Sequence, residues 1–176
     1  MNPWHDVELS KNVPEEVECV IEVPKLSNLK YELDKDTGLL KLDRAMYSAV
    51  YYPGNYGFIP RTLWEDGDPL DILVIHSNPI YPLSIVKVRP VGVIQMFDSG
   101  ESDDKILAVM VNDPRFKEVN DVHDIPEHTL KEIEYFFETY KALQGKKVHV
   151  LKTKSASDAK AAITKGIQMY KEEFIQ

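Results

Sequence analysis

Carboxylates crowd the stretch 65–71, where four of them fall within seven residues. Two like charges about 4 Å apart repel each other by roughly 4 kcal/mol at the effective dielectric of a protein surface, so the stretch requires a cation among its side chains. Hard divalent cations prefer carboxylate oxygens and are the natural candidate. Gly67 frees the backbone and Pro69 fixes it, which predicts a turn and places Asp66 and Asp68 on a loop.

Asp71 directly precedes the apolar run 72–75, so we expect it to project from the start of a buried strand. Loop and strand edge would then hold one divalent ion together. A solvated turn is the alternative on local grounds, because Asp, Gly and Pro are common in turns without function. An EF-hand calcium loop is excluded, because its sixth and twelfth positions, counted from Asp66, would be Asp71 and Ser77 in place of Gly and Glu.

A second acidic loop, residues 98–105, contains Asp98 and Asp103 and ends in a lysine. Taken alone, it is typical of a solvated hairpin loop. Two carboxylate-rich loops at the ends of neighbouring predicted strands favour a shared site, because sites are commonly built from loops on a rigid scaffold.

Cations and phenols supply the other half of the chemistry. Residues 51–60 contain three tyrosines interrupted by Pro, Gly and Asn, which predicts an irregular loop with an aromatic wall. Core packing is the alternative for these rings. Carboxylates bind metals and cations bind phosphates, so a site with both favours a metal-bound, multiply charged phosphate. The anion-binding candidates are Lys30, Arg44, Lys105 and the tyrosines.

Length and composition bound the function. With 176 residues and 43% hydrophobic content, the chain can form one sizeable core, and we expect a single domain over residues 1–176. Its net charge of −8 disfavours nucleic acid and anionic membranes, which select basic proteins. Cys19 is the single cysteine, which suits a reducing compartment. Residues 1–10 lack a basic region followed by an apolar stretch, and nowhere do about 18 apolar residues run together, so we expect a soluble, cytoplasmic protein.

Alternating apolar residues predict strands separated by turns. Residues 17–23 form a half-buried strand in which Cys19 packs into the core. Residues 30–33 and 39–44 form a β-hairpin. Further strands, which complete an antiparallel β core, are expected at 72–76, 85–88, 91–97, 106–111 and 148–151.

Two helices flank the last of these strands. The first begins at Pro126, with Asp124 available to cap it, and ends before Gly145. Ser155 and Asp158 begin the second, which is amphipathic. One face of the first helix carries Leu130, Ile133, Phe137 and Tyr140, and core packing is the alternative to a site role for this tyrosine.

The acidic stretch, read as Asp66-Gly67-Asp68-Pro69-Leu70-Asp71-Ile72, resembles the motif of the soluble inorganic pyrophosphatases of the first, Mg²⁺-dependent type. The likeness covers roughly residues 8–150, and several separated motifs in the correct order are more specific than one acidic cluster. The other matching segments are Lys30-Tyr31-Glu32, Asp43-Arg44, Tyr52-Pro53-Gly54-Asn55-Tyr56-Gly57, Arg89-Pro90-Val91-Gly92, Asp98 to Lys105, Phe136-Phe137-Glu138 and Tyr140-Lys141.

This resemblance implies a mainly β (α+β) fold, a five-stranded OB-like β-barrel with two main helices packed outside it. It also implies hydrolysis of pyrophosphate to two phosphates by a metal-activated water, with several Mg²⁺ ions per site, in a homo-oligomer for which a hexamer is one candidate state. It assigns catalysis to Asp68, Tyr56, Arg44 and Lys30. Metal ligands would be Asp66, Asp71, Asp103, Asp98 and Glu32, the phosphates would be held by Lys30, Arg44, Tyr56, Lys105, Tyr140 and Lys141, and the site would be lined by Glu22 and Tyr52.

Two other functions are compatible with parts of the sequence. A non-catalytic OB-type barrel could bind a polyanion through residues 51–58, although the acidic charge opposes it. A metallophosphatase could act on other phosphate compounds. One departure concerns residues 152–154, Lys-Thr-Lys, where bacterial members carry a Gly-Trp-Glu-like segment. This departure lies outside the site. It concerns the contacts of the final helix and the hexamer that the resemblance implies.

Overall fold

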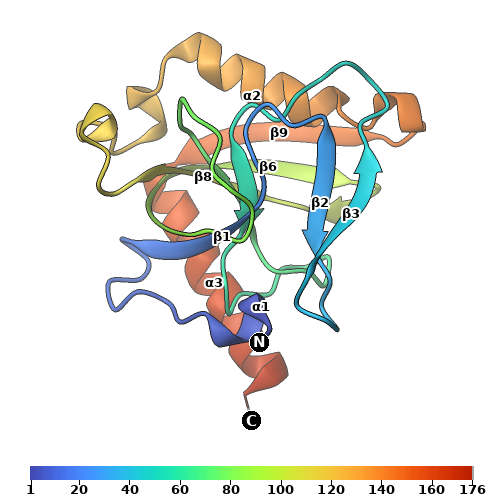
Figure 1. Cartoon of the computed structure of the whole chain (residues 1–176). Coiled ribbons are helices and arrows are strands. Elements are labelled where there is room, and N and C mark those ends of the chain that lie inside the picture. Colours follow the sequence, from blue (N-terminus) through green and yellow to red (C-terminus); the bar gives the residue numbers. More distant parts are fainter. Residues whose placement is uncertain (176) are drawn as a thin grey trace.

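Strand β6 (Ile85–Asp98) is the element on which the fold is built, because it pairs with four other strands. In the computed structural model, which describes residues 1–175, the chain is mainly β with few helices (Figure 1). The other strands are β1 (Val17–Val23), β2 (Leu29–Leu33), β3 (Leu40–Ala45), β4 (Asn55–Phe58), β5 (Asp71–Val74), β7 (Glu101–Ser102), β8 (Lys105–Met110) and β9 (Val148–Ser155). The helices are α1 (Pro3–Asp6), α2 (Glu127–Thr139) and α3 (Ala156–Phe174), with 3₁₀ turns at Pro114–Phe116, Val122–Asp124 and Ala142–Gln144.

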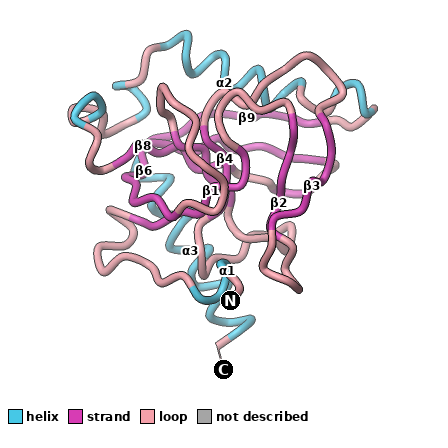
Figure 2. The backbone as a smooth tube through the Cα atoms, viewed as in Figure 1, coloured by secondary structure: helices cyan, strands magenta, loops and turns pink. Residues whose placement is uncertain are grey.

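Five strands form a closed ring, in the order β1, β4, β5, β8 and β6, because β6 also pairs with β1. Strands β2 and β3 form the predicted hairpin as a separate two-stranded sheet (Figure 2). The prediction of an entirely antiparallel core is wrong, because β5 and β8 run parallel, with Asp71 opposite Lys105. Strand β6 lies antiparallel to β8 and returns the chain across the fold, so β8 can run in the direction of β5.

Two strands differ from the predicted pattern for identifiable reasons. The segments 85–88 and 91–97 are one strand, since the sheet accommodates Pro90 by a shift of register against β8 between Pro90 and Gly92. Strand β4 lies inside the segment 51–60, for which the sequence predicts an irregular loop. Its Gly57 permits β1 to approach, because a Cβ there would lie 1.9 Å from the Val20 carbonyl oxygen.

The chain after residue 120 also differs in detail. Strand β9 extends beyond residue 151 to Ser155, and residues 152–154 pair with β6. The predicted start of α2 after Pro126 is confirmed, but Asp124 does not cap it. The Asp124 carboxylate instead accepts hydrogen bonds from the backbone N–H groups of Asn120 and Asp121, both at 3.0 Å. Helix α3 begins as predicted, with the Ser155 hydroxyl accepting the Asp158 N–H at 3.4 Å.

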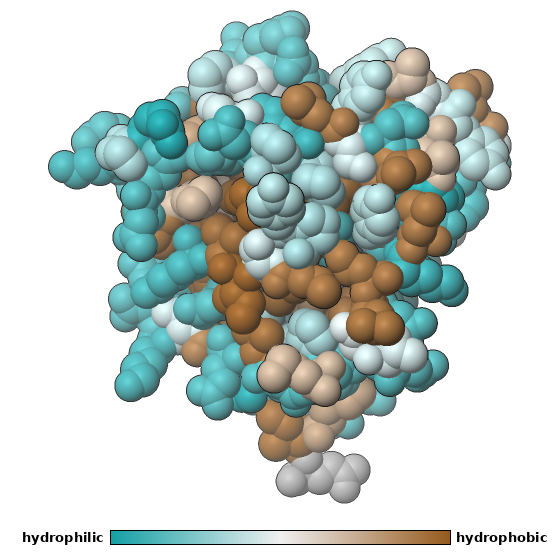
Figure 3. Space-filling view, viewed as in Figure 1, coloured by the Kyte–Doolittle hydropathy of each residue, from teal (hydrophilic) through white to brown (hydrophobic). Residues whose placement is uncertain are grey.

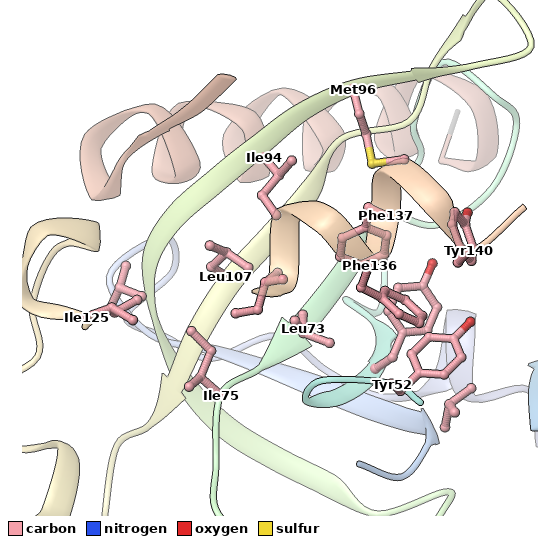
Figure 4. Packing of buried hydrophobic residues seen from close by; sticks show 14 of the residues in the cluster. Tyr52, Leu73, Ile75, Ile94, Met96, Leu107, Ile125, Phe136, Phe137 and Tyr140 are labelled. Carbon is pink, nitrogen blue, oxygen red and sulfur yellow. The ribbon is translucent and has the colours of Figure 1, made fainter. Parts of the chain in front are cut away.

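The core consists of apolar clusters on two faces of the ring. Figure 4 shows the cluster that α2 covers, in which Phe136 and Phe137 pack against side chains from β5, β6 and β8. Helix α3 covers a second cluster through Ala159 and Ile163. Cys19 lies fully buried in that second cluster, as predicted, and burial raises the pKa of its thiol. The two helices therefore hold opposite faces of the strands.

Hydrophilic residues dominate the periphery of the face viewed in Figure 3, and apolar residues gather across its middle. No helix within residues 1–175 is long and apolar enough to cross a membrane.

Replacing Gly57 with alanine is expected to destabilise the protein by about 3 kcal/mol or more, because the new methyl group would force β1 and β4 apart. Guanidinium denaturation would measure this loss. Gly166→Ala in α3 is the matched control, since its Cβ would meet its nearest neighbours at 3.4 Å, and its effect should stay within about 1 kcal/mol. Equal effects of the two variants would contradict the assignment of a close strand contact at Gly57.

Candidate active site

Charged side chains from separate parts of the chain line one cavity of about 560 Å³. Its walls come from the β2–β3 hairpin, the loop that precedes β5, the segment between β6 and β8, and the end of α2. The sequence predictions converge on this cavity, with Arg44 as the one exception among the predicted site residues. Those that line it are Glu22, Lys30, Glu32, Tyr52, Tyr56, Asp66, Asp68, Asp71, Asp98, Asp103, Lys105, Tyr140 and Lys141.

Three carboxylates meet at the base of the acidic loop. One oxygen from each of Asp66, Asp71 and Asp103 lies within 4.8 Å of the others. The parallel pairing of β5 and β8 explains how residues distant in sequence come together, because it places Asp71 opposite Lys105, two residues after Asp103. The first acidic loop, the start of β5 and the second acidic loop therefore supply one carboxylate each.

The Lys105 ammonium lies between two of these carboxylates, 2.6 Å from Asp71 Oδ2 and 2.6 Å from Asp103 Oδ1. Its side chain is only 1% exposed. Burial lowers the pKa of an ammonium, but the two carboxylates outweigh burial and raise the pKa of Lys105 above its usual value. Lys105 therefore stays charged and neutralises part of the cluster.

Burial makes the ionised forms of Asp66 and Asp71 less favourable. Burial is the main reason that the pKa of Asp66 rises to about 7 and that of Asp71 to about 6, and neighbouring carboxylates add to it. Burial also acts on Asp103, but the Lys105 ammonium prevails and lowers its pKa. When ionised, three carboxylates face one ammonium, so a further cation is favoured. A set of three carboxylate oxygens fits a hard divalent metal ion.

Aromatic side chains form one wall of the cavity. Tyr140 follows the last turn of α2 and packs against Phe136 and Phe137, with ring centroids 5.3 and 5.7 Å away. In Figure 4 the hydroxyl ends of Tyr52 and Tyr140 lie at the same edge of the cluster. Burial raises the pKa of Tyr52, Tyr56 and Tyr140. These phenols therefore stay protonated and can donate hydrogen bonds to an anion, so core packing and a place in the site coexist.

Two cationic side chains, one from β2 and one from β3, pair with carboxylates of the same hairpin. Lys30 on β2 contacts Glu32 at 3.3 Å and Asp43 at 3.6 Å, and the sheet register places it opposite Arg44. The Arg44 Nη1 donates to Asp43, whereas its Nε and Nη2 groups are buried without a hydrogen-bond partner in residues 1–175. An anion would satisfy these donors.

Lys141 and Asp98 form an ion pair beside the aromatic wall. The Lys141 ammonium also lies 5.2 Å from the centre of the Tyr140 ring. Burial lowers the pKa of Lys141, and Asp98 opposes this effect. The pair thus brings the second acidic loop against the end of α2.

Asp68 differs from the other carboxylates of its loop. Its side chain is 54% exposed and pairs with Lys35, on the turn between β2 and β3. Its backbone is fixed, because its N–H donates to Asp66 Oδ1 at 3.1 Å and its carbonyl accepts the Trp64 N–H at 2.7 Å. Asp68 therefore lies at the mouth of the cavity and not among the three clustered carboxylates.

Three further lysines line the cavity without having been predicted from the sequence, Lys35, Lys41 and Lys146. The turn 34–38 was expected only to connect two strands, although its first three residues are all charged. That run of charge at the tip of a hairpin was the available signal for Lys35. Lys146 had no comparable signal, because it follows the glycine that ends a helical segment.

Replacing Glu22 with glutamine is expected to remove a pH-dependent loss of stability in the metal-free protein. Burial raises the pKa of Glu22 from 4.5 to about 8. Between these values the folded chain keeps a proton that the unfolded chain releases, so stability falls by up to about 1.4 kcal/mol for each unit of rising pH. The glutamine oxygen can still accept the Leu33 N–H, which bonds to Glu22 at 2.7 Å.

Denaturant unfolding of both proteins at pH 5, 6.5 and 8 would measure the effect. Glu22→Gln should gain stability over the original chain as the pH rises. Parallel pH profiles would mean that Glu22 ionises as freely in the folded chain as in the unfolded one.

Comparisons with known proteins give matches over nearly the whole chain. The family model described as inorganic pyrophosphatase matches residues 19–171. Soluble inorganic pyrophosphatase 2 of Chlamydomonas reinhardtii is 48% identical over 174 residues, which cover 99% of this chain and 91% of that protein. The soluble inorganic pyrophosphatase of Zea mays is 45% identical over 99% of this chain and 82% of its own length.

Solved structures give the same result. The crystal structure of inorganic pyrophosphatase from Thermus thermophilus superposes with a TM-score of 0.93, at 44% identity, over 97% of this chain and 99% of that one. The inorganic pyrophosphatase of Helicobacter pylori gives a TM-score of 0.90 at 42% identity, over 95% of this chain and 99% of that one. The resemblance predicted from the motifs is confirmed: the chain belongs to the inorganic pyrophosphatase family.

Proposed function

We propose that this protein is an enzyme that hydrolyses inorganic pyrophosphate to two phosphates. The observation that carries the proposal is the meeting of Asp66, Asp71 and Asp103 within 4.8 Å in a cavity that also holds lysines and protonated tyrosines. Phosphoryl transfer depends chiefly on positioning and on neutralising the charge of the phosphate oxygens, and the cavity offers groups for both. Membership of the family supports the same substrate.

We infer that the metal is Mg²⁺ and that several ions act in each site. The three clustered carboxylates would hold the first, and Asp98 and Glu32 would assist further ions. When bound, such ions neutralise phosphate oxygens and make the attacking water more acidic. Mg²⁺ would suit these ligands, because it is a hard cation that prefers oxygen ligands such as carboxylates.

The cations and phenols would hold the substrate. The buried Nε and Nη2 groups of Arg44 have no hydrogen-bond acceptor in residues 1–175. This supports phosphate binding, although Arg44 does not line the cavity. Lys105 already bonds two carboxylates, and the third donor of its ammonium would serve a phosphate oxygen. Glu22 and Tyr52 would line the site, and the phosphate contacts would be completed by Lys30, Tyr56, Tyr140 and Lys141.

Asp68 would accept the proton of the attacking water. Its carboxylate is half exposed at the cavity mouth and lies outside the cluster that would hold metal, which supports a separate task. A positioned carboxylate of this kind typically contributes a factor of about 10² to 10⁴ to the rate.

We also propose the broader context expected from the family. The five-strand ring would correspond to an OB-like barrel, supported by the β1–β6 pairing that closes it. Residues 1–176 would act as one domain, in a cytoplasmic homo-oligomer. Exposed apolar side chains such as Leu26 and Tyr51 support self-association, and the hexamer is the state to test first.

Phosphate release in Mg²⁺ is the experiment that tests the function. We expect rapid release from pyrophosphate, little from sugar phosphates, nucleotides or tripolyphosphate, and none in excess chelator. A metallophosphatase of other specificity would prefer one of the alternative substrates. A polyanion-binding barrel would release no phosphate from any of them.

Asp68→Asn and Asp71→Asn should fail in different ways. Asp68→Asn keeps the shape of the side chain and removes its basicity, so we expect kcat to fall by roughly 10² to 10⁴ with metal affinity within a few fold. Asp71→Asn should act chiefly through lost metal binding, and excess Mg²⁺ should partly restore its activity. Mg²⁺ titration and turnover at saturating pyrophosphate would separate the two effects.

If excess Mg²⁺ restored Asp68→Asn to nearly the original kcat, Asp68 would be a metal ligand. The proton acceptor would then be another carboxylate, or the reaction would need no separate acceptor.

A further inference from the structure

The carboxylate of Asp68 has a single side-chain partner in the described part of the chain, the ammonium of Lys35. The same ammonium lies 3.5 Å from the Gly67 carbonyl oxygen, within the same loop. The loop fixes the backbone of Asp68 through its N–H and carbonyl groups, but among residues 1–175 no loop residue makes a hydrogen bond or ion pair with its side chain. The direction in which this carboxylate points therefore depends on a residue 33 positions away.

Lys35 is itself held from two sides. Its turn is closed by Asp34, whose Oδ1 accepts the N–H groups of Asp36 at 3.1 Å and Thr37 at 2.9 Å. The N-terminal segment supplies the second support, because the Asn2 amide donates to the Lys35 carbonyl at 2.7 Å. The Lys35 ammonium also lies 5.3 Å from the centre of the Trp4 ring, at the distance of a cation–π contact.

The position of Trp4 beside Lys35 is fixed, because Trp4 is buried and makes two hydrogen bonds to other segments. Its indole N–H donates to the Thr62 carbonyl at 2.7 Å, and its own carbonyl accepts the Arg61 N–H at 2.8 Å. Residues 61 and 62 shortly precede the acidic loop that carries Asp68. Trp4 thus links the base of that loop to the lysine that holds its tip.

We propose that Lys35 is a positioning residue for Asp68, which it holds at the cavity mouth from a turn supported by Asn2 and Trp4. The proposal rests on the proposed function, in which Asp68 accepts the proton of the attacking water. The Lys35 and Asp68 side chains are 45% and 54% exposed, and ion pairs as exposed as this contribute little to stability. The contact is therefore expected to act on the geometry of the reaction and not on the fold.

The chain contains a closely matched control. Lys165 pairs with Glu65, the two side chains are 50% and 46% exposed, and its ammonium lies 4.8 Å from the centre of the Trp64 ring. This second lysine therefore makes the same two kinds of contact at nearly the same exposure. Neither Lys165 nor Glu65 lines the cavity.

The test compares Lys35→Met, Lys35→Arg and Lys165→Met by steady-state hydrolysis of pyrophosphate in saturating Mg²⁺ and by thermal unfolding. We expect Lys35→Met to lower kcat by about 10- to 100-fold, since misplacing a reacting group by about 1 Å can cost that much, while KM and the unfolding temperature change little. Lys35→Arg should recover most of the lost kcat, and Lys165→Met should leave kcat unchanged.

A rise in KM at constant kcat in Lys35→Met would overturn the proposal, because it would make Lys35 a substrate-binding residue. Equal losses in Lys35→Met and Lys165→Met, or no loss in either, would overturn it as well. If the original chain did not hydrolyse pyrophosphate, the proposed function would fail and this inference with it. An active original chain with an equally active Lys35→Met variant would refute this inference alone.

Discussion

The burial of the Lys105 ammonium between Asp71 and Asp103 is the interaction on which the rest of the site depends. Removing an ammonium from water costs several kcal/mol unless close counter-charges and hydrogen bonds compensate it. Two carboxylates at 2.6 Å provide that compensation, and the parallel pairing of β5 with β8 brings them there. The remaining negative charge of the cluster then calls for a second cation. One contact thus connects strand direction, the protonation of the carboxylates and the demand for metal.

The aromatic wall limits the access of water to the carboxylate cluster. Phe136 and Phe137 fix the end of α2 against the ring of strands, and Tyr140 follows at the point where the helix gives way to the cavity. The wall has two effects, because it removes water from the neighbouring carboxylates and keeps its phenols protonated as donors. The apolar core under α2 and the polar site are therefore continuous. A change in the packing of α2 would alter the protonation of the neighbouring carboxylates and phenols.

Local chemistry was the part of the fold and site that could be predicted from sequence. The acidic loop, the placement of Asp71 on a strand, the hairpin and the start of α3 follow from neighbouring residues. The parallel β5–β8 pair could not be predicted, because its direction is set by the path of β6 between them. The same limit explains strand β4, which is held by two neighbours although its Pro, Gly and Asn content favours a loop. The contacts of Asn2 and Trp4 with Lys35 could not be predicted either, because they join residues that are far apart in the sequence.

The register of β5 against β8 also constrains how the chain can change in length. Paired residues share a face, so Leu73 and Leu107 lie with the aromatic cluster beneath α2, whereas Ile72 and Ile106 face α3. A single-residue insertion or deletion within either strand would exchange these faces and turn the ammonium of Lys105 into the apolar layer under α3. The turn at Gly100 lies outside this register, and its own requirement is conformational, because a φ of +86° favours glycine there. The register thus excludes changes of length within β5 and β8, and the spacing within these strands is part of what positions the site.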